Sequence, residues 1–259
     1  MKLKKAFQYQ LASGSKLLGW TVLWIAAAII VVPIITTALV GRINSLSVND
    51  FLPVGLLEFS LNVFLIFYSA MTYDGFQNMI QNGIGRKTYF YSKTLVIGLL
   101  ALVGSLVSVG YNLLVSPFSP VEREGTFSLE TMYYHFFSNG FMNHFMPFVL
   151  LVLLTICIAA TFMFIGSILG LFERRTQIAL IIGVPIVSLI AFMILAGANE
   201  EVSLKLTWIV QALMWIAGET GNAAPGELNP FQPLISGIVY SIIMFAGAYF
   251  FNLKLKTPR

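Results

Sequence analysis

Long apolar stretches alternate with short polar segments along this chain. Each of six stretches holds about 20 or more residues with very few charges: 17–40, 54–73, 94–116, 145–172, 177–196 and 234–253. A helix of about 20 apolar residues crosses the roughly 30 Å hydrocarbon layer of a bilayer. The pattern therefore predicts an all-α integral membrane protein with six transmembrane helices.

Composition supports a membrane environment. The 259 residues are 58% hydrophobic and only 10% charged, whereas a soluble domain is typically about 25% charged. A soluble fold of this size could not keep so much apolar surface away from water. The net charge of +4 then indicates contact with anionic lipid head groups rather than with nucleic acid.

The first 16 residues form a distinct segment in the pattern. Leu3, Phe7 and Leu11 recur at helical spacing among lysines and glutamines. This arrangement predicts a cytoplasmic amphipathic helix over residues 1–16, lying on the inner leaflet. Residues 17–259 then form the six-span domain. A disordered basic tail is the alternative for residues 1–16.

Basic residues are distributed unevenly between the two sides of the predicted spans. All but Arg42, Arg123 and Lys205 of the 15 basic residues lie at the termini, in the second and fourth loops, or in their flanks. The positive-inside rule places these segments in the cytoplasm. Both termini are thus predicted to be cytoplasmic, which agrees with an even number of spans.

Residues that could perform covalent chemistry are few. The chain has one cysteine, Cys157, and two histidines, His135 and His144. It lacks the HExxH, GxSxG and phosphate-loop motifs of hydrolases and nucleotide-binding proteins. We therefore expect no enzymatic activity and no metal or cofactor bound by this chain.

One polar stripe stands out within the second span. Glu58, Asn62, Ser69 and Thr72 are separated by 4, 7 and 3 residues, so they share one helical face. A carboxylate facing lipid is costly, so the stripe predicts a face toward the bundle and a possible lining of a translocation path. Alternatively, Glu58 lies one turn from the outer end and simply reaches the aqueous interface.

Two further features bear on helix packing and on the outer surface. Gly166 and Gly170 form a GxxxG pair in the fourth span, which permits close approach of another helix. The segment from Ser203 to Ala217 has an amphipathic pattern and precedes the last span. It predicts an outer interfacial or re-entrant helix.

The segment between the second and third spans is the most informative. Phe76, Met79 and Ile80 share one side of a helical turn, and glycines break the helix shortly after them. The basic pair Arg86 and Lys87 follows, and then an aromatic run. A simple loop needs no apolar face, so this pattern predicts a short cytoplasmic helix. Such a helix could be bound and displaced by a soluble partner.

This segment resembles the coupling helix of the membrane subunits of bacterial type-2 ABC transporters, the small six-span permeases. The matching positions are Asn82, Gly83, Gly85, Arg86, Lys87, Tyr89 and Phe90. The N-terminal helix and the helix before the last span are also similar in layout to that family, so the likeness covers the whole chain.

The resemblance implies the transmembrane subunit of an ATP-driven exporter in the bacterial cell membrane. A separate ATPase subunit would bind ATP and Mg, and a second permease copy or a related permease would complete a dimer. The residues implied to contact the ATPase are Phe76, Met79, Ile80, Asn82, Gly83, Arg86 and Lys87. The alternative is a non-transporting membrane accessory, immunity or sensor protein.

Overall fold

The computed structural model describes residues 2–41, 55–115, 129–133, 136–198, 207–219 and 228–255. These residues form only helices and turns, without a strand. The helices are α1 (Lys2–Leu39), α2 (Leu56–Ala70), α3 (Thr72–Gln81), α4 (Arg86–Val115), α5 (Leu129–Tyr133), α6 (Gly140–Leu169), α7 (Arg174–Ala198), α8 (Thr207–Ala217) and α9 (Phe231–Lys254).

The long helices match the predicted spans. Among the described residues, α1, α4, α6, α7 and α9 are each long and apolar enough to cross a membrane. Helix α2, with 15 residues, and the end of α3 form a bent pair with an angle of 51° between them. The pair counts as a sixth candidate span only if the two helices cross the membrane as one broken span. The chain thus has the architecture of a multi-pass membrane protein.

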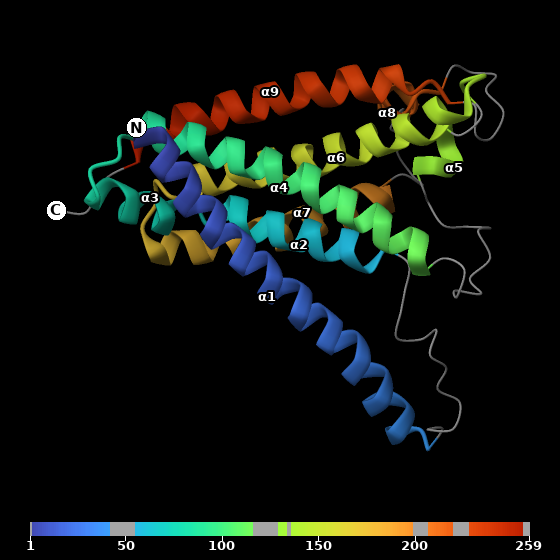
Figure 1. Cartoon of the computed structure of the whole chain (residues 1–259), viewed down its shortest axis with the longest axis horizontal. Helices are drawn as coiled ribbons and strands as arrows, with labels where there is room; N and C mark the ends of the chain where they lie inside the picture. Colours follow the sequence, from blue (N-terminus) through green and yellow to red (C-terminus); the bar gives the residue numbers. More distant parts are fainter. Residues whose placement is uncertain are drawn as a thin grey trace.

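The two ends of the bundle carry different short helices (Figure 1). Both chain termini and α3 lie at one end, which we call the termini end, and α5 and α8 lie at the other. Helix α6 packs along α9, and α2 and α4 pack against α6. Helix α7 has little contact with any other described helix.

Helix α1 differs from the sequence prediction. The expected separate helix over residues 1–16 is the first part of one continuous helix, Lys2–Leu39. Gly14 does not break it, because this glycine lies inside the packing, where a Cβ atom would meet Leu100 and Tyr68 at 3.1 and 3.4 Å. At 1.5 Å per residue the helix is about 57 Å long, and its second half diverges from the bundle (Figure 1).

The central core lies where α2, α4, α6 and α9 meet. Its buried members include Phe64 and Leu65 of α2, Ile97 of α4 and Met163 of α6. Van der Waals packing of this kind is a main attraction between helices in lipid. An apolar side chain gains little free energy by moving from lipid into a helix interface, because both surroundings are apolar.

Both glycines of the GxxxG pair lie at close helix contacts. A Cβ atom on Gly166 would collide with the backbone of Ala70 at the end of α2. A Cβ atom on Gly170 would come within 2.9 Å of Leu255. The absence of side chains at these two positions lets α6 approach α2 and the end of α9.

A helix also lies where one was predicted before the last span. Helix α8 covers 207–217, and residues 203–206 of the predicted segment lie outside the described residues. The Tyr133 hydroxyl of α5 donates a 2.7 Å hydrogen bond to the Ala217 carbonyl at the end of α8. Burial raises the pKa of Tyr133, because the phenolate would lose contact with water.

Candidate functional site

Helix α3 is a separate element with defined ends. The backbone leaves the helical conformation at Met71 (φ −74°, ψ 59°), between α2 and α3. Gly83 ends α3 with a positive φ of 71°, a conformation that glycine adopts without strain. The amides of Gly83 and Ile84 donate to the carbonyls of Ile80 and Met79, at 2.9 and 3.0 Å, which is the pairing of a Schellman motif.

The apolar face of α3 is directed into the chain itself. Phe76 is fully buried and Met79 is 4% exposed, and both pack in a cluster with Ala6, Tyr89 and Leu255. The Phe76 and Tyr89 rings meet edge to face with centroids 5.6 Å apart. The expected exposure of Phe76 and Met79 to a partner is therefore not found, because the N-terminus of α1 and the C-terminus of α9 cover them.

Arg86 also has an internal role. Its guanidinium donates a 2.6 Å hydrogen bond to the carbonyl of Leu253, in the last turn of α9. The same group lies 5.9 Å from the centre of the Phe76 ring. A cation at a helix C-terminus satisfies carbonyls that lack a helical partner and complements the helix dipole. Arg86 thus joins α4, α3 and α9, where an external contact was expected.

The remaining predicted residues lie around the end of α3: Ile80 is in its last turn, Asn82 and Gly83 follow it, and Lys87 is in the first turn of α4. Asn82, Gly83 and Lys87 are exposed, and Ile80 is half-buried. The side-chain amide nitrogen of Asn82 (Nδ2) donates a 2.7 Å hydrogen bond to the backbone carbonyl of Asn78. We call the exposed set the α3 outer face: Asn78, Gln81, Asn82, Gly83 and Lys87.

Lys93 is a buried lysine that the positive-inside pattern places only among the basic residues flanking the second loop. It is 3% exposed, and its ammonium donates to the carbonyls of Ser69 and Met71 at 3.3 and 3.5 Å. It also lies 5.4 Å from the centre of the Tyr68 ring. These two carbonyls lie at the break between α2 and α3, so Lys93 stabilises the geometry of the break.

The spacing of residues along the sequence could have identified Lys93 as a buried position. Tyr89, Lys93, Val96 and Leu100 follow one another at spacings of 4, 3 and 4 residues, so they lie on one helical face. All four are buried. An ionisable residue on the apolar face of a predicted span is expected to have a specific partner.

The polar stripe of α2 faces inward but is shorter than predicted. Glu58 and Asn62 are half-buried and Ser69 is buried. Thr72 lies beyond the break at Met71, so it does not continue the helix face of α2, and its side chain is outside the described residues. Glu58 is in the first turn of α2, where a carboxylate complements the helix dipole.

The described residues contain no group of three His, Cys, Asp or Glu side chains that could hold a metal ion. Cys157 hydrogen-bonds Ser241 at 3.2 Å, between α6 and α9, and His135 lies outside the described residues.

Comparisons with protein-family models, with curated proteins and with solved structures find no match to this chain. A function has to be argued from the residues themselves. The termini end is the best candidate because it combines a separate helix, an exposed polar face and a buried cation at a helix break.

Proposed function

We propose that this chain is the transmembrane subunit of a bacterial ATP-driven exporter of the ABC type. In this proposal it forms part of the translocation path and couples to a separate ATPase subunit, which binds ATP and Mg. The observation that carries the proposal is α3, a separate short helix at the termini end, bent from α2 at an angle of 51°. The proposal places this end in the cytoplasm, because most of the basic residues belong to it.

The contacts of α3 support two different roles for the residues around it. Phe76, Met79 and Arg86 fix α3 to α1, α4 and α9. Residues of the α3 outer face are exposed and are proposed to contact the ATPase, with the half-buried Ile80 at the edge. The Gly83 carbonyl also accepts a 3.3 Å hydrogen bond from the Lys2 ammonium of α1. A helix fixed in this way moves together with its neighbours, so displacement of α3 is transmitted to the spans.

The stripe on α2 is the proposed link between coupling and the path. Lys93 bonds the carbonyls at the end of α2, next to the start of α3. Movement of α3 would therefore change the position of α2, which carries Glu58, Asn62 and Ser69. A second permease copy or a related permease completes the path in this proposal, and membrane lipids cover the rest of the apolar surface.

The first test is whether a reading frame next to the gene of this chain encodes an ABC ATPase. The second is retention of that ATPase after co-expression with this chain and affinity purification. We expect Lys87→Glu to lower ATPase retention by about tenfold, because charge reversal at a docked face places like charges together. Lys16→Glu is the control, since Lys16 is an exposed basic residue of α1 away from α3. Met79→Glu should instead destabilise the chain, because it places a charge in a closed apolar cluster.

Two results would contradict the proposal. One is full ATPase retention by Lys87→Glu protein that elutes as a normal folded species. The other is modification of Lys87→Cys by an impermeant thiol reagent in intact cells, in a Cys157→Ser background, because that result places the termini end outside.

The competing function is a non-transporting membrane accessory, immunity or sensor protein. The internal use of Phe76, Met79 and Arg86 favours it, because these contacts stabilise α3 without any partner. This function predicts that no ABC ATPase is recovered with the wild-type chain. Recovery that depends on Lys87 separates the two functions.

A further inference from the structure

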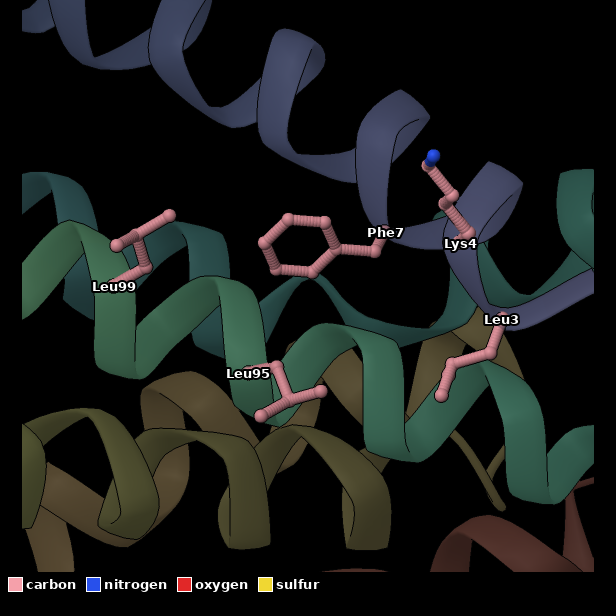
Figure 2. Close-up of a pocket in the computed structure, with 5 residues that line it drawn as sticks. All are labelled: Leu3, Lys4, Phe7, Leu95 and Leu99. Carbon is pink, nitrogen blue, oxygen red and sulfur yellow. The ribbon is translucent and has the colours of Figure 1, made fainter.

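A groove of about 460 Å³ lies between the first turns of α1 and the middle of α4. Its walls are Leu3, Lys4 and Phe7 of α1 and Leu95 and Leu99 of α4 (Figure 2). Phe7 reaches from α1 toward α4, and the Lys4 ammonium is directed away from α4. The groove is open along one side, and its lining is almost entirely apolar.

The groove exists because of the way in which α1 meets α4. Ala6 and Gly14 are buried where α1 packs on the bundle, and beyond this crossing α1 diverges (Figure 1). Leu3, Leu95 and Leu99 remain 43%, 55% and 36% exposed. The groove lies between two helices that are each candidate spans, and its apolar walls are open to the surroundings of the bundle.

The charge around the groove is positive and is not balanced on its own helices. Lys4 lies at the rim and Lys5 is exposed beside it. The Lys2 ammonium instead donates a 3.3 Å hydrogen bond to the Gly83 carbonyl at the end of α3. Neither α1 nor α4 contains an aspartate or a glutamate. Lysine side chains near a helix end extend their ammonium groups toward the head-group layer while their stems cover apolar surface.

We propose that this groove binds one anionic phospholipid. Its acyl chain lies against Phe7, Leu95 and Leu99, and its phosphate pairs with the Lys4 ammonium. The apolar walls select an acyl chain, and the uncompensated lysine selects a negative head group. This site goes beyond the proposed transport function and does not depend on it, because it concerns this chain without any ATPase.

The test is native mass spectrometry of the purified full chain in detergent, titrated with phosphatidylglycerol or with phosphatidylcholine of identical acyl chains. We expect one tightly bound phosphatidylglycerol and weaker binding of phosphatidylcholine. Lys4→Gln should lower the affinity for phosphatidylglycerol by about fivefold, the effect expected from losing one basic residue at an anionic lipid surface. Leu99→Trp should also lower it, because a larger side chain fills the groove.

Matched variants distinguish this site from general attraction to lipid. Lys5→Gln removes an adjacent exposed lysine that does not line the groove, and Leu106→Trp enlarges an exposed residue of α4 outside it. Both should bind phosphatidylglycerol as the wild type does. Equal losses in Lys4→Gln and Lys5→Gln overturn the proposal, and so does equal affinity of the wild type for the two lipids. Unchanged binding by folded Leu99→Trp protein also overturns it.

Discussion

Helices α6 and α7 are neighbours in sequence and are both strongly apolar, yet only α6 is packed. Leu151, Thr155, Ala159, Met163 and Ser167 of α6 recur every four residues and are all buried. No residue of α7 in its 18-residue spanning window is buried. Hydrophobicity alone therefore does not decide which helix enters the bundle.

Small residues and short hydrogen bonds explain the difference. Between α6 and α9, Cys157 pairs with Ser241 at 3.2 Å and Thr161 pairs with Tyr240 at 2.7 Å. Gly237 and Gly247 of α9 accommodate Leu153 and Phe164 of α6. Helix pairs in lipid are stabilised by such close approach and by interhelical hydrogen bonds.

Helix α7 has few of these devices in the described structure. At its start, Gln177 donates 3.0 Å hydrogen bonds to the carbonyls of Leu169, at the end of α6, and of Phe172. A Cβ atom on Gly183 would meet nothing within 4 Å, and the Ser188 hydroxyl donates to the Val184 carbonyl of its own helix. Its surface is rich in isoleucine and valine. Lipid chains, or a second copy of the chain as proposed above, suit such a surface.

The largest expected effect comes from a glycine on the packed side. Gly166→Leu should destabilise the folded protein by about 3 kcal/mol, because the new side chain meets the backbone of Ala70, which cannot move aside. Gly183→Leu on α7 is the matched control and should change stability little. Thermal unfolding in detergent, followed by fluorescence-detected size exclusion, measures both. Equal stability of the two variants would remove the distinction between α6 and α7.

A second prediction concerns the buried cation beside α2. Lys93→Met should lower the free energy of unfolding by about 1–3 kcal/mol, because the carbonyls of Ser69 and Met71 lose a buried hydrogen-bond donor. The control is Lys87→Met, which replaces the exposed lysine that precedes Lys93 on α4. It should lower the free energy of unfolding by less than about 0.5 kcal/mol.

Spin labels on α2 and α3 report the geometry of the break in the same variants. Lys93→Met should broaden the distribution of distances between the two helices, and Lys87→Met should leave it unchanged. A narrow, unshifted distribution in Lys93→Met would show that the bend at Met71 does not require the lysine.

The smallest expected effect comes from one interhelical hydrogen bond. Ser241→Ala should destabilise the protein by about 0.6 kcal/mol, the average for such bonds in membrane proteins, because Cys157 loses its Ser241 contact and keeps only the Gly237 carbonyl on α9. Ser188→Ala on α7 removes only a bond within one helix and should have no measurable effect. Chemical unfolding of both variants in the same detergent provides the comparison. A larger loss for Ser188→Ala would indicate that α7 is packed.

The local pattern was sufficient to predict the apolar helices, except that α1 continues through residues 1–16 and that α2 ends at a break near Met71. The length of the apolar stretches predicted the spans, and the glycines after Gln81 predicted the end of α3, since glycine readily adopts the positive φ observed at Gly83. The GxxxG spacing also indicated where α6 permits close approach. Each of these features depends on residues that are near one another in the chain.

The sequence by itself determined which stretches of this chain form apolar helices and where α3 ends, but not the continuity of α1 or the break at Met71. Only the tertiary structure decided that Phe76 and Met79 face Ala6 and Leu255, and that Arg86 bonds Leu253. An amphipathic pattern shows that a helix has an apolar face but not what covers it. Here both ends of the chain meet beside α3, and that meeting depends on helix packing between residues more than 150 positions apart.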